Sequence, residues 1–434
     1  MTRLLILLLC GVPTVLFARA PATELWVVTT DLWGNPVYQT LTLERAGKRL
    51  VGELDGDRLE GESMGNDVHF VVTDARQQTY GFNGKRSGDT LRGTADFPDP
   101  NNPQARAIHA FTARLIPARP AGPPRLHEFK PTTYSNEFSP HRQPILTIWP
   151  GDTVRTTTLD SGGVDERGVT RALFGNPQTG PFFVATATPG DTLVIRLKRL
   201  RLNRTSADSL DGIVGRALGP SLAARATELG KPVRWKLDLE RGLASLETPT
   251  ERLKGFTVPL RPMLGGLAVA PGFGAAPIST GDTGRFGGNM DFNEVVEGNT
   301  VYLPVFQPGA LLYLGDAHAA QGDGETSQYA LETSMEVEFS VDVLHGKAPS
   351  TPRVESPTHL MALGQAGSLD DALRAATSGM AQWLEQDYGL TLSEVAQVLG
   401  SSVQYGVANL AGRSVGVVAK LEKARLEGLR PSGK

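Results

Sequence analysis

The sequence has a single cysteine, Cys10, among its 434 residues. Cys10 lies within an apolar run, residues 4–17, that follows an arginine and precedes several small residues. This order predicts a secretory signal peptide over residues 1–22, cut after Ala20 or Ala22. The mature chain then has no thiol, which excludes disulfides, cysteine metal ligands and a cysteine nucleophile. We therefore expect a secreted or periplasmic protein.

The chain also lacks an excess of charge and a long hydrophobic run. Its 43 basic and 46 acidic residues nearly balance, which argues against a nucleic-acid partner. The apolar run near the N-terminus is shorter than the about 20 residues that a membrane-spanning helix needs. The densest basic stretch, residues 196–201, continues an apolar alternation of period two. It predicts the exposed face of a strand, with a register break near Arg199.

Residues 23–116 form one compositional unit that is rich in β-formers. The pairs Asp55-Gly56 and Ser87-Gly88 are hairpin signals, and the segment 56–61 recurs with similar residues at 88–93. Two similar hairpins predict a small antiparallel barrel or sandwich. No cluster of chemically useful side chains falls in this unit, so we interpret it as a binding or stabilising module.

A proline-rich linker, residues 117–124, separates this unit from a larger one, residues 125–434. The larger unit repeats a turn followed by a strand, as Pro150-Gly151-Asp152-Thr153 and Pro189-Gly190-Asp191-Thr192. We expect a mainly β (α+β) chain whose second unit is β-rich with appended C-terminal helices.

Helical patterns are confined to a few segments. Residues 208–229 are weakly amphipathic and interrupted by a Gly-Pro pair, while residues 368–386 have a stronger pattern. A further helix is expected to begin at Thr391, where Glu394 completes a capping box. Residues 415–421 predict a closing strand.

The stretch 315–325 is the most informative part of the chain. Asp316, His318, Asp323 and Glu325 lie within it, separated mainly by glycine and alanine. Small spacers allow tight backbone turns, and acids this close repel one another unless a cation or a shared proton holds them. The stretch predicts a metal site or a catalytic carboxylate cluster. The alternative is a tight Asx-turn loop around a core histidine.

Three other segments place an acid in a glycine-rich or apolar setting, at Asp160, Asp291 and Glu332. Asp160 and Glu332 have a structural alternative, because an acid at a strand end often caps backbone amides or pairs with an arginine. The common nucleophile, zinc-helix and phosphate-loop motifs are absent from the sequence. Carboxylates with one imidazole favour Zn²⁺, and the oxygen ligands alone would accept Ca²⁺. A free carboxylate, Glu325 or Glu332, could then move a proton to a leaving amine.

Six motifs stand in order along the larger unit: Pro150-Gly151-Asp152-Thr153, Thr158-Leu159-Asp160, Gln178-Thr179-Gly180-Pro181-Phe182, Gly287-Gly288-Asn289-Met290-Asp291, Tyr302-Leu303-Pro304-Val305, and the run 315–325 with Glu332 after it. In this order they resemble the acetamidase/formamidase family over residues 125–434. Such proteins hydrolyse short amides, and a related branch opens γ-lactams with zinc bound. Unlike most relatives, this chain has an export signal and an extra N-terminal β domain.

The resemblance implies roles for particular residues. Asp160, Asp291 and His318 are the expected metal ligands, with Asp316 as a further candidate, and Glu325 and Glu332 are the expected acid/base residues. We therefore predict an exported, metal-dependent amidase that cleaves small linear amides to a carboxylate and ammonia. It would act as a homo-oligomer. The alternatives are a γ-lactam hydrolase and a non-catalytic envelope protein that binds a ligand on the same fold.

Overall fold

The computed structural model describes residues 23–102, 104–272, 276–327 and 329–429. The expected signal peptide lies outside these residues. The chain divides into two compact units. One comprises Met1–Pro36 and Leu41–Pro117, and the other comprises Val37–Thr40 and Ala118–Lys434. No helix among the described residues is long and apolar enough to cross a membrane.

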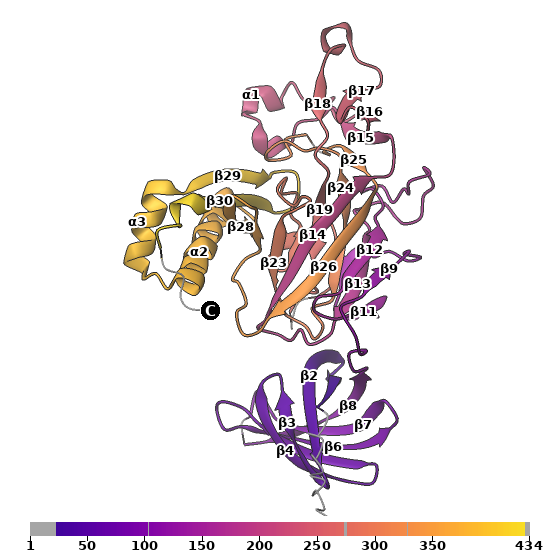
Figure 1. The fold of residues 1–434 in the computed structure, drawn as a ribbon, viewed down its shortest axis with the longest axis vertical. Helices are drawn as coiled ribbons and strands as arrows, with labels where there is room; N and C mark the ends of the chain where they lie inside the picture. Colours follow the sequence, from indigo (N-terminus) through magenta and orange to yellow (C-terminus); the bar gives the residue numbers. More distant parts are fainter. Residues whose placement is uncertain (1–22, 103, 273–275, 328, 430–434) are drawn as a thin grey trace, which may run out of the picture. The chain divides into compact units, whose positions relative to one another are not determined.

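The first unit is a closed antiparallel barrel of eight sequential strands, which confirms the expected small barrel (Figure 1). The strands are β1 (Glu24–Leu32), β2 (Asn35–Ala46), β3 (Arg49–Leu54), β4 (Asp57–Met64), β5 (Asp67–Thr73), β6 (Thr79–Ser87), β7 (Thr90–Pro98) and β8 (Arg106–Ile116). Both hairpin signals mark turns, between β3 and β4 and between β6 and β7. β8 pairs with β1 and closes the barrel.

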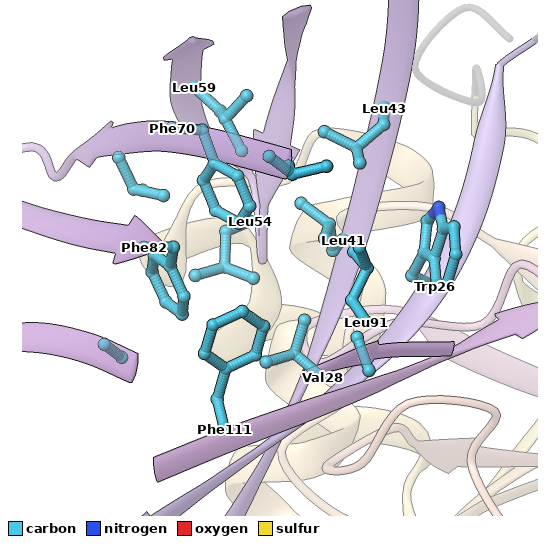
Figure 2. Packing of buried hydrophobic residues seen from close by; sticks show 14 of the residues in the cluster. Trp26, Val28, Leu41, Leu43, Leu54, Leu59, Phe70, Phe82, Leu91 and Phe111 are labelled. Carbon is cyan, nitrogen blue, oxygen red and sulfur yellow. The ribbon is translucent and has the colours of Figure 1, made fainter. Parts of the chain in front are cut away.

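Alternate residues of these strands point inward and form an apolar core (Figure 2). Phe70 and Phe82 stack with their ring centroids 4.7 Å apart, and Phe111 meets Phe82 edge to face. Close approach of the strands requires glycine at Gly93, where a Cβ would lie 1.9 Å from the carbonyl oxygen of Asn83. The core cluster consists of hydrocarbon and ring surfaces, and the buried polar side chains described in this unit are Thr30, Ser63 and His109.

Most strands of the second unit form two large sheets. The larger runs in the order β18 (Thr257–Pro259), β17 (Leu243–Leu246), β16 (Pro232–Asp238), β15 (Ser206–Leu210), β25 (Glu332–Thr333), β24 (Leu312–His318), β19 (Met263–Ala268), β22 (Gly287–Asn289) and β21 (Thr283–Gly284). β13 (Gln178–Val184) also pairs with β24, and β11 (Leu146–Ile148) pairs with β13. The small pair β10 (Glu137–Phe138) and β20 (Ile278–Ser279) lies apart from both sheets in the pairing.

The smaller sheet runs in the order β29 (Gln404–Asn409), β30 (Val415–Glu422), β28 (His359–Ala366), β27 (Arg353–Glu355), β23 (Thr300–Pro304), β14 (Thr192–Leu202), β26 (Met335–Leu344), β12 (Thr153–Thr157) and β9 (Leu126–Glu128). The two sheets contact through aromatic side chains, since Phe182 of β13 meets Phe339 of β26 at 5.5 Å. The pairing of β14 with β26 shifts between Leu197 and Arg199, which confirms the expected register break.

Of the two C-terminal helices, the first packs on β28 and β30, and the second packs against the first. Helix α2 (Leu369–Tyr388) begins after Ser368, whose side chain accepts the backbone N–H of Asp371. Helix α3 (Leu392–Ser402) has the expected capping box of Thr391 and Glu394. Both helices and the closing strand β30 were predicted from the sequence and are confirmed. A 3₁₀ turn, Lys423–Arg425, follows β30.

The helix expected at residues 208–229 is wrong. The segment holds the end of β15, a 3₁₀ turn at Gly215–Ala217 and the short helix α1 (Pro220–Ala223). Strand pairing explains why the predicted helix does not form, because β15 is hydrogen-bonded to both β16 and β25. The Ser209 hydroxyl also accepts the indole N–H of Trp235 within the sheet. These long-range contacts override a weak helical pattern. A further 3₁₀ turn, Glu251–Leu253, precedes β18.

Candidate functional site

The candidate site lies at the end of β24, a strand in which every residue is buried. Asp316 and His318 are two residues apart on this strand, and Asp316 Oδ2 lies 3.6 Å from His318 Nε2. β19 and β25 flank β24, and His318 pairs directly with Glu332 of β25. The predicted site residues His318 and Glu332 are therefore neighbours because of the register in which β24 and β25 pair.

Two groups of potential ligands meet at His318. Asp316, His318 and Glu332 form one group, and Asp291, His318 and Glu325 form the other. Within each group the ligand atoms lie within 4.8 Å of one another. Five of the six residues predicted for the site are thus brought to one place, from β24, β25 and the loops after β22 and β24.

The backbone is unusual at three of these acids. Asp291, Asp316 and Glu325 have φ values of 43°, 54° and 43°, in the left-handed region that non-glycine residues rarely adopt. Such conformations persist where surrounding contacts hold them, and they concentrate at functional sites. Here they direct three carboxylates from separate segments toward one imidazole.

Gly265 of β19 makes room for the acids. A Cβ at this position would lie 2.5 Å from Asp291 Oδ1 and 2.5 Å from Asp316 Oδ2. No side chain fits against those two carboxylates without moving them. The absence of a side chain at position 265 is therefore part of how the site is built.

His318 has a defined orientation. Its Nδ1 lies 2.8 Å from Gln321 Oε1, while Gln321 Nε2 donates to the backbone carbonyl of Asp291 at 2.5 Å. Because the amide nitrogen of Gln321 is used in this way, its oxygen accepts from Nδ1–H. The other ring nitrogen, Nε2, then faces the acids, 3.1 Å from Glu332 Oε1 and 3.6 Å from Asp316 Oδ2. This is the arrangement of a metal-binding histidine whose second nitrogen is anchored.

Among the residues that the structure describes, four buried atoms of the site have no hydrogen-bond partner: Asp291 Oδ1, Asp316 Oδ1, His318 Nε2 and Glu332 Oε2. Buried polar atoms are nearly always paired, so four such atoms on neighbouring residues need a common explanation. These atoms belong to residues of the two groups that meet at His318, and carboxylate oxygens with an imidazole nitrogen are donors that a divalent cation accepts. The residues present therefore fit a metal ion.

Glu325 differs from these four residues. Its Oε1 accepts the backbone N–H of Ala330 at 3.0 Å. Its exposed fraction is 6%, against 1–4% for Asp291, Asp316, His318 and Glu332. Glu325 is thus the least buried member of the cluster.

Burial and mutual repulsion dominate the protonation of the site. Burial raises the pKa of Asp291 well above its usual range, and the neighbouring Glu325 and Asp316 add to the shift. Burial likewise raises the pKa of Glu325 to about 8 and raises the pKa of Glu332. Burial alone would lower the pKa of His318, but Glu332 and Asp316 outweigh it and hold that pKa well above its usual range. The acids therefore need a proton or a cation among them.

Asp160, a predicted ligand, lies outside both groups. Its Oδ2 pairs with Arg204 Nη1 at 2.8 Å, and its Oδ1 accepts the backbone N–H of Val164 at 2.8 Å. Both residues of the ion pair are buried. The sequence analysis gave pairing with an arginine as the structural alternative for Asp160, and this pairing is present. A ligand role for Asp160 stays a prediction, and we leave it out of the ligand set proposed below.

The sequence did not single out the amides that support the acids. Asn176 donates to Asp316 Oδ2 at 3.1 Å and to Asn289 Oδ1 at 2.8 Å, and Asn289 donates to Asp291 Oδ2 at 2.5 Å. Asn289 stands in one of the glycine-rich motifs, which was the only available signal. Asn176 follows Gly175 in a loop whose pattern gives no indication of its role.

The model of the acetamidase/formamidase family matches residues 274–405, within the larger unit. A 61-residue segment is 39% identical to the acetamidase of Mycolicibacterium smegmatis and covers 14% of this chain. The matched segments span only 10–15% of the lengths of the curated relatives.

Solved structures extend the similarity over most of the chain. An acetamidase structure from Yersinia enterocolitica has a TM-score of 0.61 and 27% identity, covering 70% of this chain and 93% of its own. One from Bacillus halodurans has a TM-score of 0.59 and 27% identity, covering 70% of this chain and 99% of its own. Family model, short sequence matches and fold agree with one another. Over its larger unit the chain is similar to the acetamidase/formamidase family.

Proposed function

We propose that the larger unit is a metal-dependent amidase that cleaves a small linear amide to a carboxylate and ammonia. The four unpartnered buried atoms of Asp291, Asp316, His318 and Glu332 carry this proposal. Because the chain resembles proteins that are named as acetamidases and formamidases, these atoms support a metal site where amide chemistry is expected.

The donor set favours zinc. One imidazole nitrogen with carboxylate oxygens suits Zn²⁺, whereas Ca²⁺ prefers oxygen ligands alone. A divalent ion held by these residues would polarise an amide carbonyl and lower the pKa of water toward about 7. Glu332, an expected acid/base residue, is assigned here to the ligand set because its Oε2 lacks a partner and its Oε1 lies 3.1 Å from His318 Nε2.

Glu325 is the proposed proton carrier. Amide cleavage requires a proton on the departing nitrogen, because an amide anion is a poor leaving group. A carboxyl with a pKa of about 8 holds a proton near neutral pH and can also release it. The backbone N–H of Ala330 fixes Oε1, so Oε2 is the atom that exchanges the proton. Gln321 keeps His318 Nδ1 engaged and so prevents the imidazole from competing for that role.

Metal analysis and an ammonia assay test the proposal. Purified protein is expected to contain about one divalent ion per chain and to release ammonia from formamide or acetamide. A chelator should abolish ammonia release, and added Zn²⁺ should restore it. A γ-lactam is included as a further substrate, since ring opening without ammonia would indicate the cyclic-amide alternative. A tightly bound metal with no turnover of any amide would favour a ligand-binding protein on this fold.

We also propose that the enzyme acts outside the cytoplasm and assembles as a homo-oligomer. The order of residues over 1–22 supports export, and similarity to the family supports assembly. N-terminal sequencing of the secreted or periplasmic fraction should give a chain that begins at residue 21 or 23. Light scattering on the purified protein measures its mass. A full-length chain in the cytoplasm, or a monomer, would contradict the corresponding proposal.

A further inference from the structure

Two carboxamides hold the Asp291 side chain. Asn289 Nδ2 donates to Asp291 Oδ2 at 2.5 Å, and Asn409 Nδ2 donates to the same oxygen at 2.6 Å. The other oxygen, Oδ1, has no hydrogen-bond partner. Because both donors bind Oδ2, Oδ1 is the oxygen of Asp291 that remains available to the group formed with His318 and Glu325.

The carboxamide of Asn409 can point only one way. Its Oδ1 accepts the backbone N–H of Ala411 at 2.6 Å and that of Gly412 at 3.1 Å. Because the oxygen is used by these two donors, the amide nitrogen has to face Asp291. Asn409 is fully buried, so water does not compete for either end.

The backbone around Asn409 is fixed as well. Asn409 forms an isolated bridge with Gly324, the residue before Glu325, and Leu410 N donates to Gly324 O at 2.8 Å. The guanidinium of Arg216 donates to carbonyl oxygens of residues 410, 412 and 413. Asn409 is therefore a rigid donor that is tied to the segment carrying Glu325.

The topology makes this contact unexpected. Asn409 is the last residue of β29, at the edge of the smaller sheet, whereas Asp291 follows β22 of the larger sheet. The C-terminal helices were predicted as appended. The strand that follows them, β29, reaches a carboxylate of the site in the other sheet through Asn409.

We propose that Asn409 is a positioning residue of the site, which turns Asp291 so that Oδ1 faces His318 and Glu325. It acts through Asp291 and touches no reacting atom. The consequence for metal binding rests on the proposed function, whereas the consequence for the Asp291 conformation does not. Residues that orient metal ligands typically change metal affinity by about 10–100-fold when they are replaced.

Asn409→Asp separates positioning from structural support. Aspartate keeps the oxygen that accepts from Ala411 and Gly412, but it replaces the donor to Asp291 with a second carboxylate oxygen. The matched control is Asn299→Asp. Asn299 is also buried and donates its Nδ2 to a backbone carbonyl, that of Glu294, at 2.9 Å. Asn409→Ala adds no charge and serves as the second variant if Asn409→Asp does not fold.

Crystal structures of the chelator-treated proteins provide the first measurement. In Asn409→Asp, and to a smaller extent in Asn409→Ala, the Asp291 carboxylate should turn away from its wild-type position. In Asn299→Asp it should stay in place. An Asp291 side chain that keeps its position in both Asn409 variants would overturn the proposal.

The second measurement is the affinity for Zn²⁺ and Co²⁺ by competition with a chelator. Asn409→Asp is expected to bind about 10–100-fold more weakly, and the Co²⁺ absorption bands should change. Asn299→Asp should bind as the wild type does. An unchanged affinity in a folded Asn409→Asp variant contradicts the proposal. If the wild type itself binds neither ion, the proposed function fails, and the crystal structures alone decide the role of Asn409.

Discussion

The buried acids of the two Pro-Gly-Asp turns contrast with those of the site. Asp152 is 3% exposed and Asp291 is 1% exposed, so their burial is nearly the same. Asp152 nevertheless accepts three hydrogen bonds, from Arg125 N at 2.8 Å, His127 Nε2 at 2.9 Å and Trp149 N at 3.2 Å. Asp291 accepts donors on only one of its oxygens.

The aspartate of the second turn is hydrogen-bonded in the same way as that of the first. Asp191 accepts from Thr188 N at 3.0 Å, His345 Nδ1 at 3.0 Å and Gly346 N at 2.9 Å. Each turn thus satisfies its aspartate with two backbone N–H groups and one histidine. In the site, the acids face one another and one shared histidine instead.

The pKa values of Asp152 and Asp291 follow this difference in hydrogen-bond donors. Burial alone would raise the pKa of Asp152, but hydrogen bonds from Arg125 and His127 hold that pKa below its usual range. Burial raises the pKa of Asp291, and its neighbours Glu325 and Asp316 add to that effect. A buried aspartate is therefore no functional signal by itself. The signal is a buried carboxylate oxygen that has no donor.

The largest effect is expected for Glu325→Gln. Glutamine keeps the size of the side chain and the acceptor for Ala330, but it cannot carry a proton. Ammonia release should fall by about 10²–10⁴-fold while the bound metal is retained. The control is Asp191→Asn in the second turn, for which turnover per folded molecule should be unchanged. Steady-state kinetics and metal analysis check both variants. Full activity in Glu325→Gln would assign the proton transfer to another residue.

Gly265→Ala tests the space that the acids occupy. The new methyl group would displace Asp291 and Asp316, since a Cβ would lie 2.5 Å from an oxygen of each. Metal affinity should fall by about 10–100-fold, the range seen when a ligand's surroundings are disturbed. Gly255→Ala is the control, because nothing lies within 4 Å of a Cβ there. Equal affinities in the two variants would show that Gly265 is unimportant to the site.

The paired substitutions Asp152→Asn and Asp291→Asn test the contrast directly. Asp152→Asn should lower the free energy of unfolding by about 1–3 kcal/mol, since it loses hydrogen bonds to a charged group. Asp291→Asn, measured with chelator, should be as stable as the wild type or more so, because it removes a repelling acid. Urea unfolding at neutral pH measures both. A destabilised Asp291→Asn and a neutral Asp152→Asn would reverse the comparison.

The pH dependence of the Asp152 effect has a definite sign. The pKa of Asp152 is lowered in the folded state, so its ionised form stabilises the fold above the unfolded-state pKa of about 3.9. This contribution disappears as the pH falls through the lowered folded-state pKa. The stability difference between wild type and Asp152→Asn should therefore be full near neutral pH and shrink in strong acid.

Local patterns predicted much of the fold and of the site. The acidic stretch 315–325 indicated Asp316, His318 and Glu325, and the capping box of Thr391 and Glu394 marked a helix start. Long-range partners were beyond such patterns. No local pattern shows that Arg204 pairs with Asp160, and nothing local to Asn409 indicates that it reaches Asp291. The helix predicted over residues 208–229 is wrong for the same reason, because strand pairing with distant residues overrides the local helical pattern.

The smallest effect is expected for Asp323→Ala. Asp323 belongs to the acidic stretch that first indicated the site, yet it is exposed and accepts a hydrogen bond only from Asn293, at 2.8 Å, among the contacts of the described residues. Its charge is solvated, so the substitution should change stability by no more than about 0.5 kcal/mol and leave metal affinity unchanged. Chelator competition and urea unfolding measure both. A clear loss of metal would show that proximity in sequence, and not the missing donors, defines the ligand set.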